Sequence, residues 1–257
     1  MKDITEALAA LRAPAPAGLE SEILAGAGLA DRYTTRPGPI GTLYVAFNEH
    51  GVSCVDTAPN GADFEERFAA RFGRPAVPAA DVPARLTTRI DRAIARGRPG
   101  DLELDRRGIT EFQAAVLDKT AEIPRSEVRP YGWIAREIGR PGAVRAVGSA
   151  LAANPVPLIV PCHRVVRSDG TFGDYSLGGP GHKPLLLAEE GLDVAGYRAL
   201  ARRGVRYVGS DTTGVYCHPT CRHARRIHTT HRLEFRSARD AIRAGFRPCR
   251  VCRPAVA

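Results

Sequence analysis

The stretch Pro161-Cys162-His163-Arg164-Val165 places one cysteine between a proline and a histidine–arginine pair. Proline fixes its own φ angle near −65° and has no backbone donor, so the residue after it can be held in one pose. A thiol beside histidine and arginine is expected to have a lowered pKa, and its thiolate is a nucleophile. The alternative is a cysteine that only packs in a core. The pair alone favours the packing cysteine, because short cysteine signatures transfer poorly between families.

The motifs on either side of this stretch change that balance. They occur in this order: Phe112-Gln113, Tyr131 to Ala135, Arg145 to Gly148, Asn154-Pro155, Pro161 to Val165, Gly178-Gly179, Lys183 and Glu190-Gly191. In order and spacing the set resembles the O6-alkylguanine-DNA alkyltransferases, also called methylated-DNA–protein-cysteine methyltransferases, over roughly residues 32 to 193. The resemblance implies that Cys162 takes an alkyl group, once and without a cofactor, from O6-alkylguanine in double-stranded DNA. O4-alkylthymine is a further candidate substrate.

The resemblance also assigns the residues around Cys162. His163 would take the thiol proton through a water, and Glu190 would orient His163. Cys162, His163 and Glu190 would then act as nucleophile, base and orienting residue. Asn154 would hold the active-site turn. The expected walls of the guanine pocket are Tyr175, Ser176 and Val165.

For a damaged guanine to reach a thiolate, the base must be flipped out of the duplex. By resemblance, Tyr131 turns the 3′ phosphate and Arg145 fills the gap left by the base. A recognition helix over residues 143–153 would lie in the minor groove, where small side chains allow close approach. The residues of this helix that we expect to contact DNA are Ala143, Ala146, Gly148 and Ser149. Arg164, two residues after Cys162, is a further expected DNA contact.

Three positions depart from the family pattern. Leu117 stands where a tryptophan is frequent, and Pro130 stands where serine or threonine is usual. The run Tyr175 to Gly179 is one residue longer than the usual Tyr-x-Gly-Gly. The extra residue leaves the pocket lid and the tolerated size of the alkyl group open.

Two close cysteine pairs near the C-terminus indicate a metal site. Cys217 and Cys221 are spaced C-x3-C, and Cys249 and Cys252 are spaced C-x2-C. Four thiolates in two close pairs meet the tetrahedral preference of zinc. A redox disulfide is the alternative, although the reducing compartment expected for this chain argues against disulfides. Four histidines near the cysteines could also bind a metal, but a site made of four cysteines leaves no coordination position for them. These histidines are His218, His223, His228 and His231.

The cysteine-rich segment resembles the zinc domain of Ada-type DNA repair proteins over roughly residues 205 to 254. That resemblance implies that Cys217 is also a nucleophile, which takes a methyl group from a methylated DNA phosphate. Arg222, Arg225 and Arg226 would meet the DNA backbone. The order is unusual, because the family's zinc domain comes first in the chain. We expect the family's leading helix to be absent, since only Leu192 to Arg206 separates the module from the alkyltransferase segment. A zinc module that holds DNA and accepts no methyl group is the alternative.

Charge is concentrated at the C-terminus. The chain has 257 residues and a net charge of +9, and residues 202–257 carry 13 arginines against three acidic residues. Such a patch is typical of a nucleic-acid partner, with a solvated surface as the alternative. No signal peptide or membrane-spanning apolar run is visible, so we expect a cytoplasmic protein. We also expect it to act as a monomer.

Local patterns predict the fold. A short helix is expected over residues 1–12, a β-hairpin over residues 40–56 with Cys54 packed in the core, helices over residues 63–72 and 85–96, and a linker at residues 97–100. A capping box at Thr110 and Gln113 opens a helix that runs to Ala121. Helices over residues 131–138 and 143–153 read as a helix-turn-helix, although helical hairpins are common.

The expected architecture has three parts. The two resemblances imply an α/β domain of ribonuclease H-like shape over residues 1–106 and a mainly α winged helix-turn-helix alkyltransferase domain over residues 107–193. Residues 194–257 would then form a linker and a small zinc-bound α+β domain. Two other functions compete with DNA repair. A methylation-sensing regulator needs a further domain of about a hundred residues, for which no segment has room. A non-enzymatic lesion-binding protein lacks the acceptor cysteine, whereas Cys162 is present.

Overall fold

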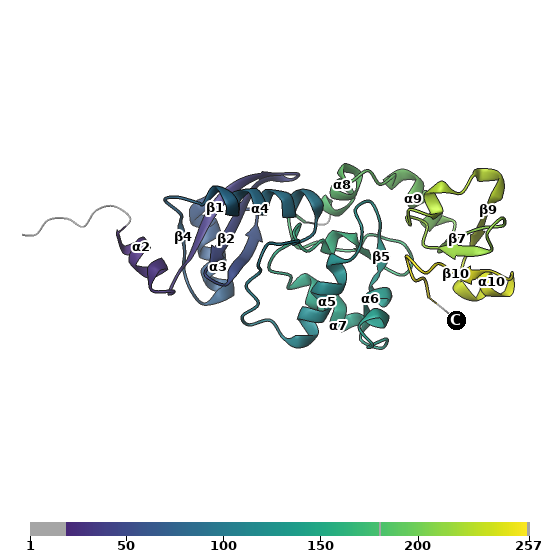
Figure 1. The fold of residues 1–257 in the computed structure, drawn as a ribbon, viewed down its shortest axis with the longest axis horizontal. Coiled ribbons are helices and arrows are strands. Elements are labelled where there is room, and N and C mark those ends of the chain that lie inside the picture. Colours follow the sequence, from purple (N-terminus) through teal and green to yellow (C-terminus); the bar gives the residue numbers. More distant parts are fainter. Residues whose placement is uncertain (1–18, 180, 256–257) are drawn as a thin grey trace, which may run out of the picture.

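The computed structural model describes residues 19–179 and 181–255, so the helix expected over residues 1–12 lies outside the described residues. The described chain is elongated, with three parts in a row along its long axis (Figure 1). A short helix, α2 (Leu19–Gly26), precedes a sheet at one end, helices fill the middle, and a second sheet lies at the other end. Among these residues no helix is long and apolar enough to cross a membrane.

The N-terminal sheet has the strand order β3-β2-β1-β4. Its strands are β1 (Asp31–Gly38), β2 (Gly41–Asn48), β3 (Gly51–Asp56) and β4 (Ala76–Pro78). The predicted hairpin is confirmed as β2 and β3, which pair antiparallel. β1 pairs antiparallel with β2 and parallel with β4. β1 is not apparent in the sequence, because DRYTTRPG is mostly polar and contains a proline.

Helices cover both faces of this sheet. They are α3 (Gly61–Phe72) and α4 (Ala84–Arg96), both at their predicted positions. Leu43 and Val45 of β2 pack with Ile90 of α4, whereas Tyr44 packs with Phe64 of α3. Residues 43–47 of β2 are therefore buried without a break. Cys54 is buried in the α3-side cluster, which confirms its predicted packing role.

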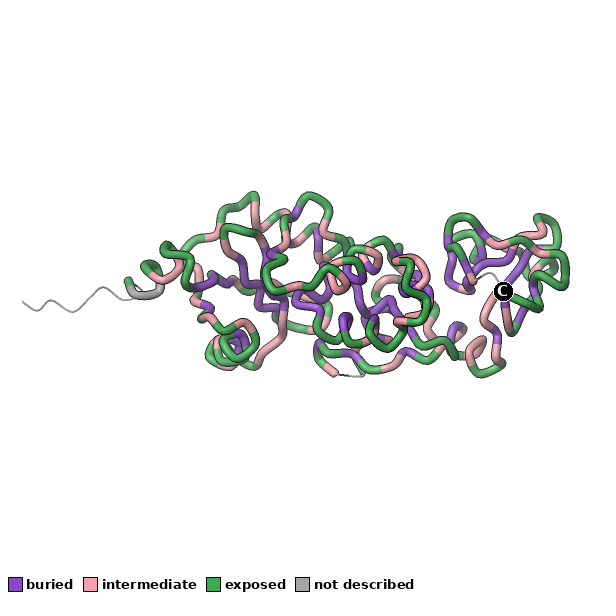
Figure 2. The backbone as a smooth tube through the Cα atoms, turned by 90° about the horizontal axis from the view of Figure 1, so that it is seen from below, coloured by how far each residue is buried: buried purple, intermediate pink, exposed green. Residues whose placement is uncertain are grey.

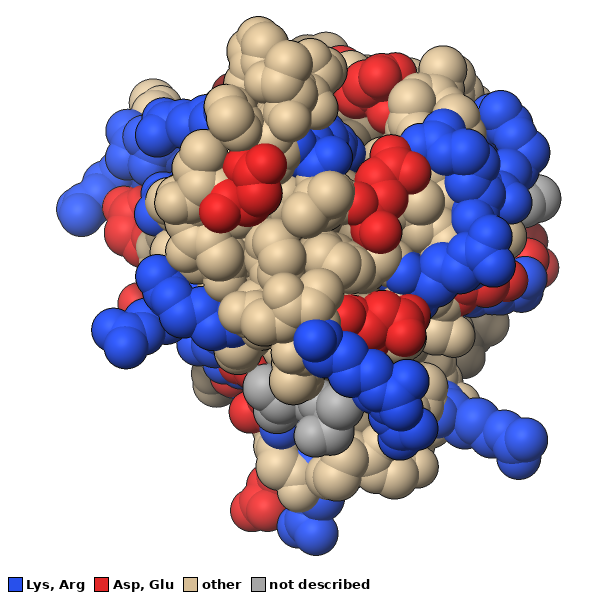
Figure 3. Space-filling model, turned by 90° about the vertical axis from the view of Figure 1, so that its right-hand side faces the viewer, with Lys and Arg blue, Asp and Glu red and all other residues tan. Residues whose placement is uncertain are grey.

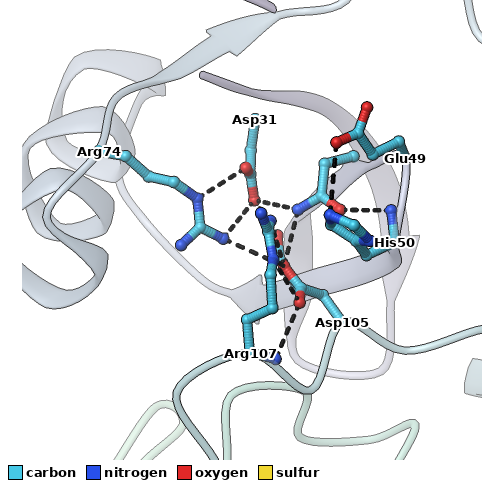
Figure 4. A network of polar contacts seen from close by, with 8 residues as sticks. Asp31, Glu49, His50, Arg74, Asp105 and Arg107 are labelled. Carbon is cyan, nitrogen blue, oxygen red and sulfur yellow. Dashed lines mark hydrogen bonds and ion pairs between the residues drawn. The ribbon is translucent and has the colours of Figure 1, made fainter. Parts of the chain in front are cut away.

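A polar cluster surrounds two buried carboxylates, those of Asp31 and Asp105, in the N-terminal part (Figure 4). Arg74 Nε donates to Asp31 Oδ1 at 2.8 Å, and Asn48 Nδ2 bridges Asp31 and Asp105 at 3.0 and 2.8 Å. Arg107 donates to Asp105 at 2.7 Å. Burial alone would raise the pKa of each carboxyl, but hydrogen bonds, foremost from Arg74 to Asp31 and from Arg107 to Asp105, lower both. The cluster is charge-compensated and ties the start of β1 to the segment that leaves this part of the fold.

The middle of the molecule is mainly helical. It contains α5 (Glu111–Ala121), β5 (Arg129–Pro130), α6 (Tyr131–Glu137), α7 (Val144–Ala152), the 3-10 helix η1 (Cys162–Arg164), β6 (Val165–Val166) and α8 (His182–Glu189). The three predicted helices are confirmed to within one or two residues. Thr110 Oγ1 accepts from Gln113 N at 3.2 Å, but the Gln113 side chain donates to Ala153 O at 3.3 Å. The reciprocal half of the capping box is therefore wrong, because Gln113 ties α5 to the end of α7 instead.

The first two parts share one hydrophobic core. A single cluster contains Leu43 and Val55 of the sheet together with Val147 and Cys162 of the helical part. Figure 2 shows this burial running from the sheet into the middle of the molecule, with a second buried region at the C-terminal end. The boundary predicted between residues 106 and 107 lies beside this shared core and stays a prediction.

The C-terminal part is a small sheet with the strand order β10-β8-β7-β9. Its elements are α9 (Val194–Arg202), β7 (Tyr207–Ser210), β8 (Val215–Cys217), η2 (Ala224–Arg226), η3 (Thr229–His231), β9 (Arg232–Phe235), α10 (Ala238–Arg243) and β10 (Arg247–Pro248). The expectation that no helix leads into this module is wrong. Asp193 caps α9 by accepting from Gly196 N at 2.8 Å, and Tyr197 packs on Phe172 with ring centroids 5.5 Å apart.

Candidate functional site

Cys162 begins η1, directly after Pro161, and its side chain is buried. Asn154 Nδ2 donates to Cys162 Sγ at 3.3 Å and to Val160 O at 3.0 Å. Asn154 Oδ1 accepts from Val156 N at 3.1 Å. One amide side chain therefore holds both ends of the turn. Leu158 within it has a φ of 71°, which a non-glycine residue adopts only when its surroundings fix the backbone.

His163 and Glu190 form the pair that the sequence predicts. His163 Nε2 lies 2.8 Å from Glu190 Oε1. Burial by itself raises the pKa of Glu190, but hydrogen bonds from His163 and Arg164 bring it down to about 2. Glu190 is thus an ionised acceptor, so His163 Nε2 carries the proton that it donates. Burial lowers the pKa of His163, which keeps the ring neutral and leaves a lone pair on Nδ1. Among the described residues Nδ1 has no partner, so it is available as a base.

The resemblance predicts that Arg164 contacts DNA, but its side chain is buried, with 1% of the residue exposed, and so does not lie on the surface of this structure. It donates to both carboxylate oxygens of Glu190 and to the backbone oxygens of Gly97 and Ile123, at 2.6 to 3.1 Å. Gly97 has a φ of 58° and passes so close that a Cβ there would lie 2.2 Å from the guanidinium. Gly97, the first residue of the expected linker, therefore packs directly against Arg164. Arg164 in turn holds the Glu190 carboxylate in place.

The expected lowering of the Cys162 pKa is also wrong. Burial raises the pKa of this thiol, and the hydrogen bond from Asn154 and the charge of Lys183 only partly offset it. Arg164 does not contribute, because it points to Glu190. Lys183 is itself buried, which lowers its pKa to about 8, and its Nζ donates to Phe172 O at 2.9 Å. Lys183 belongs to the ordered motif set, yet the sequence gives no sign that its charge faces the thiol.

A pocket of about 500 Å³ adjoins Cys162. Its walls include Tyr131, Arg145, Tyr175, Ser176 and Lys183. The Tyr175 hydroxyl is buried and has no partner among the described residues, so it is available to a bound base. Val165 is not a pocket wall as predicted, because it is fully buried in the core and pairs with Arg129.

Helix α7 divides into a buried and an open face. Val147, Ala150 and Leu151 point into the core. Arg145, Ala146 and Ser149 are exposed, Gly148 is half-buried, and Ala143 lies just before the helix. Arg145 and Gly148 of this open face also line the Cys162 pocket. Contacts of these residues with DNA stay a prediction.

The four C-terminal cysteines converge as predicted. The sulfur atoms of Cys217, Cys221, Cys249 and Cys252 all lie within 4.8 Å of one another and all four residues are buried. In a tetrahedral zinc site with Zn–S distances near 2.3 Å, neighbouring sulfurs are roughly 3.8 Å apart. The donor set therefore fits zinc, and within the described part of the chain none of the four nearby histidines joins it.

The four thiols differ in their access to solvent. Cys221 and Cys252 are fully buried, whereas Cys217 and Cys249 line a pocket of about 590 Å³. Arg226, Arg247 and Arg250 line the same pocket. Two of the sulfurs thus face a basic hollow at the surface.

Comparisons with known proteins agree with both parts of this arrangement. Residues 111–192 match the model described as 6-O-methylguanine DNA methyltransferase, DNA binding domain. Residues 196–255 match the metal binding domain of Ada, so the match begins within α9.

Two curated relatives illustrate the similarity. The chain is 39% identical over 172 residues to the bifunctional transcriptional activator/DNA repair enzyme Ada of Escherichia coli, covering 64% of this chain and 47% of that protein. It is 50% identical over 90 residues to the methylated-DNA–protein-cysteine methyltransferase of Mycolicibacterium paratuberculosis, covering 35% of this chain and 53% of that protein. The chain spans about half the length of these relatives.

One solved structure of a related protein is matched over nearly its whole length. The crystal structure of the O6-methylguanine methyltransferase of Mycobacterium tuberculosis is 34% identical with a TM-score of 0.50, and the match covers 62% of this chain and 92% of that one. Because the match covers nearly all of that chain, the likeness is not confined to one motif. The chain belongs to the O6-methylguanine-DNA methyltransferase family and carries an Ada-type metal binding domain behind it.

Proposed function

We propose that this chain repairs O6-alkylguanine in double-stranded DNA by moving the alkyl group to Cys162 in a single turnover. One observation carries the proposal: Cys162, stapled by Asn154, is followed by a neutral histidine whose orientation a buried glutamate fixes. The pocket beside the thiol supports the proposal, because it has room for one base. Tyr175 and Ser176 in its wall each carry a hydroxyl group that can bond to that base. The family membership supports it as well.

The chemistry balances without a co-reactant. His163 accepts the Cys162 proton through a water, and the thiolate attacks the alkyl carbon. The sulfur–carbon bond forms as the bond from carbon to guanine O6 breaks, and the electron pair stays on the base. The displaced guanine takes up a proton, which restores the charge count. The product is a thioether, so Cys162 is not regenerated.

For the damaged base to reach the thiol, the protein must also bind the duplex around it. We propose that α6 and α7 act as a winged helix-turn-helix that enters the minor groove, beside an N-terminal domain of ribonuclease H-like type. Arg145 fits the gap-filling role, because it is exposed on α7 and at the same time lines the Cys162 pocket. The protein acts on duplex DNA as a monomer in this proposal.

Intact-mass measurement tests the proposal directly. The protein is incubated with a duplex that carries one O6-methylguanine, and the modified peptide is then identified. We expect a gain of one methyl group on Cys162, equal to the guanine repaired, after which the reaction stops. Cys162→Ala keeps DNA binding and loses transfer. A methyl that stays on guanine in DNA would support a lesion-binding protein, and continued turnover would exclude a suicide acceptor.

A second activity is favoured by the pocket at the cysteine cluster. We propose that Cys217 takes a methyl group from a methylphosphotriester in DNA. Bound zinc would keep the four thiolates ionised at neutral pH. Cys217 lines a hollow with three arginines, whereas Cys221 and Cys252 have no exposed surface. The sulfur attacks the methyl carbon, the carbon–oxygen bond breaks, and the phosphate leaves as an ordinary diester.

DNA with methylphosphotriesters and no alkylated base separates this activity from the first. In a Cys162→Ala protein, we expect methyl on the peptide that contains Cys217. Cys249→Ser tests the other sulfur in the pocket. If the zinc-loaded protein binds this DNA and remains unmodified, the module holds DNA and accepts no methyl. Tighter DNA binding after methylation would support a regulatory role in addition.

A further inference from the structure

A cleft separates the alkyltransferase part from the zinc module. Its volume is about 930 Å³, and its walls come from both parts and from α9 between them. Tyr131 and Arg136 of α6 line one side, and Arg206, Arg236 and Arg239 of the zinc module line the other. Neither module alone would form this surface.

The zinc module is fixed where it lies. Thr220 Oγ1 accepts from Val128 N at 2.9 Å, and the backbone N–H of Arg222 donates to Glu127 Oε1 at 2.9 Å. Thr220 and Arg222 flank the zinc ligand Cys221 on both sides. Val128, Glu127 and Thr220 are all buried, so these bonds lie in a dry interface. The two walls of the cleft are therefore held at a set distance rather than joined by a loose linker.

The cleft is strongly basic. Five of the described residues that line it are arginines, and one is acidic, Asp169. Arg167 lies 3.5 Å from the exposed Asp174. Within the described residues, Arg136, Arg206, Arg236 and Arg239 pair with no carboxylate. Figure 3, which views the molecule from the zinc-module end, shows Lys and Arg side chains gathered around the edge of that face. Unpaired arginines on two facing walls suit a polyanion between them.

The cleft continues into the Cys162 pocket. Tyr131, Val144 and Arg167 line both hollows, so a strand that presents a base to Cys162 passes the mouth of the cleft. A free nucleotide or an acidic peptide would need no such continuity. We propose that the cleft binds the sugar-phosphate backbone of the lesion-bearing DNA beside the flipped base, with Arg236 and Arg239 as zinc-module contacts. The proposal rests on the proposed repair of O6-alkylguanine and adds the second wall of its DNA site.

Matched arginines on α10 give a sharp test. Arg239 faces the cleft, whereas Arg243 on the same six-residue helix is exposed and does not line it. Binding to a long O6-methylguanine duplex is measured against salt in a Cys162→Ala background. Each phosphate contact contributes about −0.9 to the slope of log affinity against log salt. Arg236→Ala combined with Arg239→Ala should flatten the slope by about 1.8, and Arg243→Ala should leave it nearly unchanged.

Duplex length and a free base complete the test. On a duplex too short to reach the cleft, the double variant and its parent should bind alike. With Cys162 intact, transfer from O6-benzylguanine should proceed at the parent rate in every arginine variant. Equal slopes for the Arg236→Ala/Arg239→Ala double variant and for Arg243→Ala would overturn the cleft proposal and leave these arginines as a solvated surface. Absence of transfer to Cys162 in the parent would instead overturn the proposed repair activity, whatever the slopes show.

Discussion

The indole Nε1 of Trp133 donates a hydrogen bond to the backbone carbonyl of Cys252 at 3.0 Å. Trp133 lies on α6, two residues after Tyr131 of the Cys162 pocket, and Cys252 is a predicted zinc ligand. The guanidinium of Arg253 lies 5.6 Å from the centre of the Trp133 ring and 2.7 Å from Glu137 at the end of the same helix. One short helix thus supports both chemical centres.

Removal of the metal should be visible at Trp133. The chain has a single tryptophan, which is buried against the cysteine cluster. Four uncompensated thiolates repel one another, so a chelator should loosen the ligand loops and expose the indole. We expect a red shift of tryptophan emission and stronger quenching by acrylamide, reversed by zinc and not by magnesium. Unchanged emission with the metal shown to be absent would mean that docking does not need it.

Glu190→Gln should destabilise the protein at neutral pH. The substitution leaves Arg164 buried without its carboxylate, which typically costs about 3–5 kcal/mol of unfolding free energy. The pKa of Glu190 falls to about 2 on folding, from an ordinary value of 4.5, so the unfolded chain binds more protons between these values. The stabilisation by Glu190 is therefore complete above about pH 4.5 and is lost as the pH falls toward 2.

Urea unfolding of parent and variant at several pH values measures this difference. Glu189→Gln is the matched control, since Glu189 is a neighbouring glutamate whose side chain accepts no hydrogen bond from Arg164. We expect the difference in unfolding free energy between parent and variant to shrink on acidification for Glu190→Gln and to stay unchanged for Glu189→Gln. A gap that stays constant with pH would contradict the low pKa.

Arg145→Ala should separate base flipping from alkyl transfer. Extrusion of a base costs a few kcal/mol, so loss of the residue that fills the gap should slow repair of duplex DNA by roughly ten- to a hundredfold. Transfer from free O6-benzylguanine needs no flipping and should change little. Single-turnover rates on the two substrates give the comparison. An equal loss on both would show that Arg145 shapes the pocket rather than the DNA.

Lys183→Met should make the Cys162 thiol harder to ionise. The lysine charge lowers the pKa of that thiol, so its removal shifts the pH dependence of Cys162 alkylation by iodoacetamide to higher pH. At neutral pH we expect a lower alkylation rate, since a higher thiol pKa leaves a smaller fraction of Cys162 as thiolate. Lys119→Met is the control, because Lys119 in the last turn of α5 pairs with Glu122 just after that helix. Identical pH profiles for parent and Lys183→Met would exclude the electrostatic role.

Local patterns sufficed for much of the fold and for both chemical centres. The helices from Gly61, Glu111, Tyr131 and Val144 follow from apolar spacing and end signals within a dozen residues. The four-cysteine cluster follows from two short spacings, because each C-x2-C or C-x3-C pair is already close in space. Cys162 and its partners Asn154, His163 and Glu190 follow from ordered motifs rather than from any single one.

Other features depend on contacts between distant segments. Arg164 reads as a surface cation in sequence, but it is drawn inward by Glu190, 26 positions later. β1 is polar and becomes a strand only by pairing with β2 and β4. Burial raises the pKa of Cys162, and the hydrogen bond from Asn154 and the charge of Lys183 lower it. These three influences come from the tertiary fold and not from the residues next to Cys162 in the chain.

The cleft is the clearest case of what the tertiary structure alone decides. The sequence gives an excess of arginines at the C-terminus, because charge can be counted without a fold. It does not tell which of them face Tyr131, since that depends on how the zinc module docks on Glu127 and Val128. Spacing along a chain fixes which ligands and helices form, whereas the direction of a side chain and the charge opposite it are fixed only when separate segments exclude water between them.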